Sequence, residues 1–167
     1  MRKPIYLKLT NEDIQRIRQQ DERFLQQLYK DVFPIMMSVA VRFMNNREEQ
    51  LTAVHNAFMK MIRSIDQFRS NSSFEAWIVR ILRNELIDEF RRNNKQSAIK
   101  FSELKDDIQD HDFQIDQLEN TAPAQLLQLL NELPPASKVV FNLYAIDEYS
   151  IKQISEALEI SIETVQW

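Results

Sequence analysis

The sequence of 167 residues contains no glycine and no cysteine, and its only histidines are His55 and His111. Phosphate-binding loops, dinucleotide-binding turns and the sharp turns that carry a nucleophilic serine all need glycine, so the sequence disfavours these classes of enzyme. Without cysteine the chain can form no disulfide bond, no zinc site with thiolate ligands and no thiol nucleophile. We therefore expect no structural metal, no cofactor and no catalytic residue.

The lack of glycine also bears on the fold. Glycine accounts for about 7% of residues in average proteins, and it adopts left-handed backbone conformations without a steric penalty. We expect a fold that dispenses with left-handed turns. An all-α fold does so most easily.

Long apolar segments are missing as well. No stretch reaches the roughly 18 consecutive apolar residues of a membrane-spanning helix, and the N-terminus has no apolar run of signal-peptide length. Hydrophobic residues still make up 44% of the chain, which is enough to form buried cores. These features predict a soluble cytoplasmic protein that does not insert into a membrane.

Composition divides the chain into two helical blocks, residues 1–94 and 123–167. Within each block, apolar residues recur at the spacing of amphipathic helices. Between them, in residues 95–122, acidic residues outnumber basic ones and apolar residues are scattered, which predicts a flexible acidic linker. We therefore expect two small helical domains joined by this linker.

In the first block, Thr10 or Asn11 can cap a short opening helix. Apolar positions then continue from Phe24 to Phe43 through Pro34, which predicts one kinked helix or two abutting helices. An amphipathic helix follows from Arg47. Its polar face is formed by Glu48, Thr52, His55, Asn56 and Lys60.

The polar loop Arg69–Ser73 precedes another amphipathic helix, which Ser73 can cap. Trp77 lies among apolar residues of this helix, so we expect it in the core. The other side of the helix is basic. A charged helix face is often only exposed to solvent, but the polar loop beside this one favours a role in binding nucleic acid. The residues of the basic side are Arg80, Arg83, Asn84, Arg91 and Arg92.

In the second block, a leucine-rich helix ends at Pro134-Pro135, which also opens the next helix. The apolar residues of that helix are Val139, Val140, Leu143 and Tyr144. A helix over Ser150–Leu158, a brief turn at Glu159-Ile160 and a new start at Ser161 then follow. Helix, short turn and helix form the motif that reads DNA in many regulators.

Three stretches together resemble the bacterial sigma factors of the extracytoplasmic-function group. The first runs from Glu48 to Lys60. The second runs from Phe68 to Arg92 and contains the polar loop, Phe-x-x-Trp, Arg-Asn, Ile-Asp and a basic end. The third runs from Leu133 to Val165. Their order and spacing agree with the family over nearly the whole chain.

This resemblance implies two helical domains that bind core RNA polymerase and are not an enzyme by themselves. The first domain would read and melt the minus-ten promoter element, and the second would read the minus-thirty-five element. Many such factors are held inactive by an anti-sigma factor, so the resemblance also implies that partner.

The resemblance assigns candidate residues to three surfaces. A flipped base and the adjoining phosphates would bind Arg69, Ser70, Asn71, Ser72, Ser73, Arg80, Arg83, Asn84, Arg91 and Arg92. The minus-thirty-five element would bind Ser161, Ile162, Glu163, Thr164, Gln166 and Trp167. Core polymerase would bind Glu48, Glu49, Thr52, His55 and Asn56.

The sequence departs from the family's pattern in two places. The docking face usually carries an acid, a glutamine and a second acid, where this chain has Thr52, His55 and Asn56. Either Glu48 and Glu49 supply the missing charge, or docking is weaker or adapted to a different partner surface. Only six residues follow Ser161, which predicts a truncated chain, or else impaired reading of the minus-thirty-five element.

Other functions stay open at this point. The chain could be a sigma-like regulator or adaptor that binds a protein partner without initiating transcription. It could also be a stand-alone helix-turn-helix regulator, or a structural helical bundle. The net charge of −4 is unlike that of a protein that binds naked DNA, and it agrees with DNA binding only inside a polymerase complex.

Overall fold

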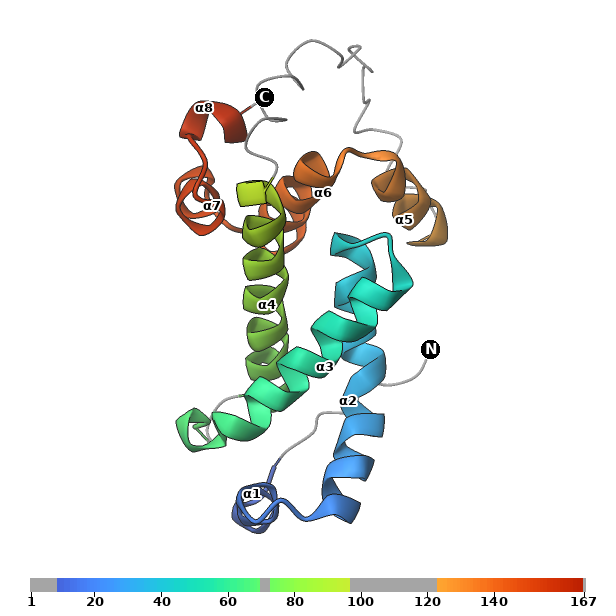
Figure 1. Cartoon of the computed structure of the whole chain (residues 1–167), viewed down its shortest axis with the longest axis vertical. Coiled ribbons are helices and arrows are strands. Elements are labelled where there is room, and N and C mark those ends of the chain that lie inside the picture. Colours follow the sequence, from blue (N-terminus) through green and yellow to red (C-terminus); the bar gives the residue numbers. More distant parts are fainter. Residues whose placement is uncertain (1–8, 70–72, 97–122, 167) are drawn as a thin grey trace. The chain divides into compact units, whose positions relative to one another are not determined.

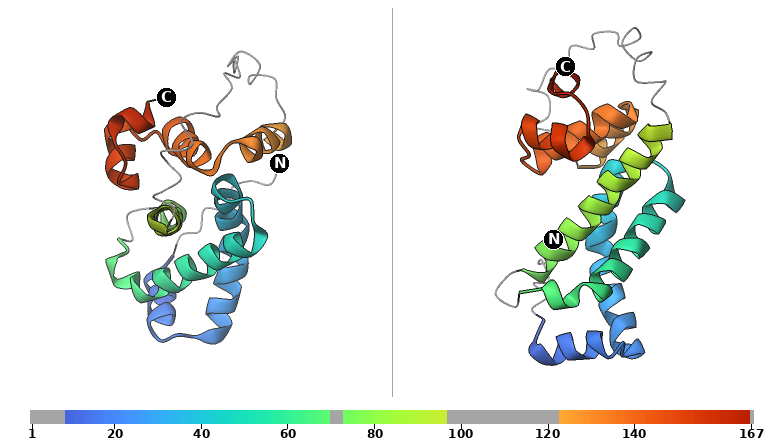
Figure 2. Two further views of the ribbon diagram at one scale, coloured as in Figure 1. Left: turned by 45° about the horizontal axis from the view of Figure 1, so that its top comes forward. Right: turned by 60° about the vertical axis from the view of Figure 1, so that its left-hand side comes forward.

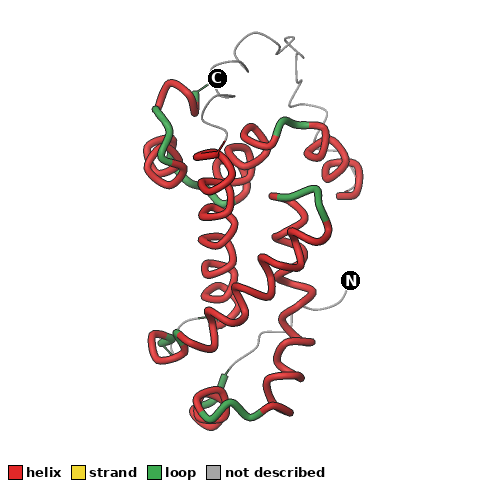
Figure 3. The backbone as a smooth tube through the Cα atoms, viewed as in Figure 1, coloured by secondary structure: helices red, strands yellow, loops and turns green. Residues whose placement is uncertain are grey.

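The computed structural model describes residues 9–69, 73–96 and 123–166, and every regular element in these ranges is helical (Figures 1 and 3). The all-α prediction is confirmed. The chain divides into two compact units, Met1–Leu86 and Ile87–Trp167. Nearly all of the predicted linker, residues 97–122, lies outside the described residues.

The first helix begins where the sequence places its cap. In α1, Asn11–Arg18, the Thr10 hydroxyl accepts the Asp13 N–H at 3.1 Å, and the Asp13 carboxylate accepts the Thr10 N–H at 2.9 Å. This reciprocal pair satisfies two backbone donors that a helix start leaves open. The second helix, α2, spans Glu22–Phe43 with Pro34 inside it. Of the two predicted arrangements, the structure has the single helix.

The next two helices follow polar caps as well. Asn46 accepts the backbone N–H groups of the first turn of α3, Arg47–Arg63. A short 3₁₀ turn, Ile65–Gln67, leads toward the polar loop. The next helix, α4, spans Phe74–Gln96, and the Ser73 hydroxyl accepts the Ala76 N–H at 3.2 Å. The predicted cap of this helix is therefore confirmed.

The core of the first unit lies where the apolar stripes of its helices meet. Figures 1 and 2 show α2 and α3 side by side, and they share the most extensive helix contact of the described residues. Trp77 is buried beside Phe68 and Phe74, with its ring centroid 5.2 Å from that of Phe68. The prediction that Trp77 belongs to the core is confirmed. The fully buried side chains include Val32, Met36, Val54, Met61, Ile78 and Leu82.

The second unit contains α5, Pro123–Glu132; α6, Pro135–Phe141; a π-helical turn, Asn142–Ile146; α7, Ile151–Leu158; and α8, Ile162–Val165. Its buried apolar residues are Leu130, Val139, Leu143, Ile154, Leu158 and Val165. The break at Pro134-Pro135 is as predicted. The helix predicted over Ser150–Leu158 is α7, which Ser150 caps.

One apolar residue of this unit is on the surface. Tyr144, one of the residues that the sequence gives as apolar in this helix, is 58% exposed. The backbone forms a π-helical turn here, in which the Asp147 N–H bonds to the Asn142 carbonyl at 3.0 Å. This turn is wider than that of an α-helix, and Tyr144 lies within it.

The expectation that this glycine-free chain dispenses with left-handed residues is wrong. Gln20, Glu148 and Glu159 have φ values of 54°, 58° and 56°. Gln20 lies between α1 and α2, and Glu159 caps the C-terminal end of α7. Helix ends commonly need a left-handed residue, and here side chains with a Cβ atom fill those positions at a cost of about 1–2 kcal/mol each.

We expect Glu148→Gly to raise the free energy of unfolding by about 0.5–1 kcal/mol, because glycine removes the left-handed strain and loses part of this gain to backbone entropy. Chemical denaturation of the full chain measures the change. Glu148→Ala is the matched control, since alanine removes the carboxylate and keeps the Cβ atom. Equal stability of the two variants would contradict a strain-based account.

A lysine is buried in the second unit. Lys138 is 1% exposed, its Nζ donates to Asn131 Oδ1 at 2.7 Å, and burial lowers its pKa. The unfolded chain therefore binds more protons than the folded chain between the lowered pKa and the ordinary lysine pKa. The second unit should gain stability as pH rises through this window.

We expect Lys138→Met to remove this alkaline gain, because methionine has similar length and no titratable group. Denaturation of the full chain at a series of pH values, followed by methyl resonances of the second unit, measures it. The same pH slope in both proteins would assign the effect to another group.

Candidate functional site

The polar face of α3 is arranged as the sequence predicts. Thr52, His55 and Asn56 are all exposed, at spacings of three and four residues that place them on one face. Glu48 and Glu49 are exposed in the first turn of the same helix. The five candidate docking residues therefore belong to one helix surface, with the acidic pair at its N-terminal end.

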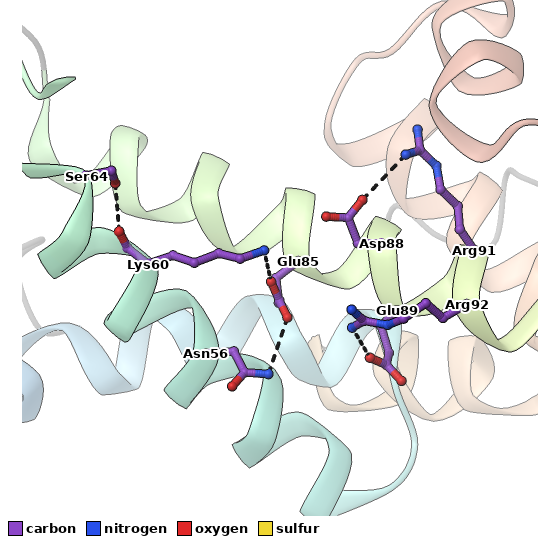
Figure 4. A network of polar contacts seen from close by, with 8 residues as sticks. All are labelled: Asn56, Lys60, Ser64, Glu85, Asp88, Glu89, Arg91 and Arg92. Atoms are coloured by element: carbon purple, nitrogen blue, oxygen red, sulfur yellow. Dashed lines mark hydrogen bonds and ion pairs between the residues drawn. The ribbon is translucent and has the colours of Figure 1, made fainter.

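Two buried polar residues, Gln50 and Glu85, form hydrogen bonds on the inner side of α3. Neither was predicted from the sequence as a functional residue. The Gln50 side-chain amide donates to the Met44 carbonyl at 2.7 Å. Glu85 of α4 is 4% exposed, accepts the Asn56 amide at 3.3 Å, and forms an ion pair with Lys60 (Figure 4). Glu85 lies on the same face of α4 as the buried residues Ile78 and Leu82. A charged residue within an apolar stripe was the feature of the sequence that could have indicated a buried, paired carboxylate.

An apolar groove of about 670 Å³ runs between α2 and α3. Met59 lines it and is 47% exposed. Tyr29 also lines it, packs edge-on against Phe58 with centroids 5.0 Å apart, and has a pKa raised by burial. The groove makes the C-terminal half of α3 more apolar than its N-terminal half.

The basic side of α4 carries fewer unneutralised charges than the sequence suggests. Arg80 is exposed and forms no ion pair within the part of the chain that the structure describes. Arg83 is half-buried and Asn84 is exposed. These three positions leave the middle of α4 as its positive section.

The last two arginines of α4 have acidic neighbours one turn earlier on the same helix. Arg91 lies 3.5 Å from Asp88, and Arg92 is paired with Glu89 (Figure 4). Opposite charges three residues apart on a helix face each other. Both arginines were predicted from the sequence as phosphate ligands, and neither of the two pairs was predicted.

Of the polar loop, the structure describes both ends. Arg69 is exposed, and Ser73 is exposed with its hydroxyl engaged in capping α4. Ser70, Asn71 and Ser72 lie outside the described residues. The Ser73 side chain thus has a structural role in addition to any contact with a base.

The helix-turn-helix of the second unit consists of α7 and α8. The Ser161 hydroxyl accepts the Thr164 N–H at 3.2 Å and caps α8. Ile162, Glu163 and Gln166 are exposed, whereas Thr164 is half-buried. The candidate Trp167 lies outside the described residues.

Glu163 adds a negative charge at the start of α8. Its own backbone N–H, and then the Ser161 hydroxyl, hydrogen-bond to the carboxylate and lower its pKa. The carboxylate therefore stays ionised at neutral pH. This charge suits the positive end of the helix dipole and opposes a phosphate at the same place.

In the described part of the chain, no helix is both long and apolar enough to cross a membrane. The same residues contain no cluster of three histidine, aspartate or glutamate side chains with the arrangement of a metal site.

Comparisons with known proteins match both units. Residues 28–96 match the family model of Sigma-70 region 2, and residues 124–166 match that of Sigma-70 region 4. The ECF RNA polymerase sigma factor SigW of Bacillus subtilis is 27% identical over 152 residues, which cover 83% of this chain and 78% of SigW. The ECF RNA polymerase sigma-E factor of Haemophilus influenzae is 24% identical over 162 residues, covering 92% and 85% of the two chains.

Among solved structures, the sigma factor RpoE of Bartonella quintana, crystallised with the anti-sigma factor NepR, is 20% identical to this chain. The match covers 84% of this chain and 86% of RpoE, with a TM-score of 0.48.

The two regions, in this order along one chain, define a sigma factor of bacterial RNA polymerase. The chain belongs to the extracytoplasmic-function group of the sigma-70 family, which confirms the resemblance found in the sequence.

Proposed function

We propose that this protein directs core RNA polymerase to specific promoters and assists promoter melting. The observation that carries the proposal is the presence of regions 2 and 4 of the family in order on one chain. The exposed polar face of α3 and the basic section of α4 support it. As a sigma factor, the protein contributes recognition, and the polymerase performs the covalent chemistry.

The proposed binding functions are divided between two domains and the segment that links them. In this proposal, residues 1–94 form the domain that binds core polymerase and the minus-ten element, and residues 123–167 form the domain for the minus-thirty-five element. The acidic segment 95–122 links them. The polymerase binds the α3 face of Glu48, Glu49, Thr52, His55 and Asn56.

Promoter melting is assigned to the loop and to α4. Base edges can be read only after a strand is unstacked, and the hydroxyl and amide groups of residues 69–73 can hydrogen-bond an extruded base. Arg80 and Arg83 would neutralise phosphates beside it, which lowers the electrostatic cost of holding a separated strand.

An anti-sigma factor is the partner proposed for the resting state. RpoE of Bartonella quintana was crystallised with such a partner, NepR. We place the protein in the cytoplasm, where polymerase is found.

A second candidate function follows from one observation. The docking face of α3 has no acid at positions 52, 55 and 56. A sigma-like adaptor that binds a protein partner without starting transcription would also fit such a face.

Co-purification with core RNA polymerase from the native host, followed by transcription on genomic fragments, tests the proposal. We expect a stable complex and promoter-specific transcripts. A complex without transcripts would favour the adaptor. If a well-folded chain forms no complex with core polymerase, the assignment of the α3 face as a polymerase-docking surface is refuted. That result would favour a stand-alone DNA-binding regulator.

A further inference from the structure

The buried carboxylate of Glu85 lies directly beneath the docking face of α3. We infer that Glu85 orients Asn56 so that its amide oxygen faces the partner, which gives the docking face a hydrogen-bond acceptor for lysine and arginine side chains. This inference rests on the proposed function and names a positioning residue for it.

The first step follows from the chemistry of the two side chains. A carboxylate accepts hydrogen bonds and has none to donate, so Glu85 can engage only the NH₂ group of Asn56. The contact is between Asn56 Nδ2 and Glu85 Oε1, at 3.3 Å. Figure 4 shows the Asn56 oxygen turned away from Glu85.

The second step concerns what an exposed Asn56 then offers. An asparagine that rotates freely presents two donors as readily as an acceptor. With its NH₂ group engaged by Glu85, Asn56 presents its acceptor oxygen, as an aspartate would. The buried acid on α4 therefore gives an uncharged residue on α3 one property of the acid that the family usually has there.

Lys60 completes the arrangement. Its ammonium group forms an ion pair with Glu85 Oε2, and its side chain is about half exposed. Without Glu85, this ammonium group would stand one helical turn from Asn56 as an additional positive charge. A partner that carries lysine or arginine would then be repelled, so Glu85 favours such a partner in two ways.

A double-mutant cycle on core polymerase binding tests the inference. We expect Glu85→Gln to weaken binding about three- to tenfold, the size expected from losing control of one hydrogen bond. Glutamine can donate as well as accept, so it no longer fixes Asn56. In an Asn56→Ala background, Glu85→Gln should weaken binding clearly less, because the oriented group is already absent and only the neutralisation of Lys60 is lost.

The readout uses labelled full-length protein titrated with core polymerase from the native host. Thermal unfolding of each variant checks its fold. If Glu85→Gln does not fold, the double variant Lys60→Met with Glu85→Leu replaces it. That variant leaves no lone buried charge and removes the Lys60 ammonium group, so it should show only the part of the loss that depends on Asn56.

The outcomes separate the inference from the proposed function. Wild-type protein that fails to bind core polymerase would overturn both. Wild-type protein that binds, with Glu85→Gln weakening binding equally in the presence and in the absence of Asn56→Ala, would overturn the inference alone. A loss that is clearly larger while Asn56 is intact would support it.

Discussion

Replacing Leu143 by alanine is expected to lower the free energy of unfolding of the second unit by about 2–5 kcal/mol. Leu143 is fully buried, at 0% exposure, and its carbonyl accepts the Tyr149 N–H at 2.8 Å. Removing its side chain loses transfer free energy and leaves a cavity. A small helical unit has only several kcal/mol of stability, so a large share of it would be lost.

Hydrogen exchange of the full chain measures this effect, because amides of each unit report on their own unit. Exchange should accelerate in α6 and α7 and stay unchanged in α2 and α3. Tyr144→Ala is the matched control: it is the neighbouring residue, it is exposed, and its replacement should change stability by less than about 0.5 kcal/mol. Similar effects of the two substitutions would show that Leu143 is not a core residue.

Replacing Arg80 and Arg83 together by alanine is expected to reduce promoter opening about tenfold or more, while the fold and the binding of core polymerase are retained. The two guanidinium groups form the positive section of α4, and removing either one weakens the electrostatic hold on the phosphates of the separated strand. Permanganate footprinting of thymines in the melted region, in a reconstituted holoenzyme, measures opening. The loss should shrink as salt is lowered.

Arg92→Ala is the control for charge, because it leaves intact the hydrogen bond from Arg91 to the Ala157 carbonyl. It removes one positive charge from the same helix, at a residue that is paired with Glu89. We expect a smaller loss of opening from this variant. Normal opening by a folded Arg80 and Arg83 variant would remove α4 from the proposed DNA surface.

Much of the fold could be predicted because it is encoded locally. The helix starts at Asn11, Arg47 and Ile151 follow side chains that can cap them, and Pro135 both ends one helix and opens the next. Apolar periodicity also predicted the burial of Trp77. Each of these signals lies within a few residues of the feature it determines.

The failed or missing predictions concern contacts that the local pattern does not encode. Tyr144 lies in a π-helical turn that contacts both α6 and α7, and the apolar pattern does not show such a turn. Glu85 and Lys60 lie on different helices, and their pairing is visible only after α3 and α4 are packed. The left-handed conformation of Glu148 was not expected from a sequence without glycine. Tertiary packing can hold a residue in such a strained conformation.

The paired arginines at the end of α4 also affect how the protein meets DNA outside the polymerase. Asp88 and Glu89 are resident counterions for Arg91 and Arg92. A phosphate that approaches must displace a covalently tethered carboxylate, and this exchange releases no ion to bulk solvent. Such contacts add little to the entropy gain that drives unspecific DNA binding. We therefore expect these two arginines to contribute little to the binding of DNA that is not a promoter.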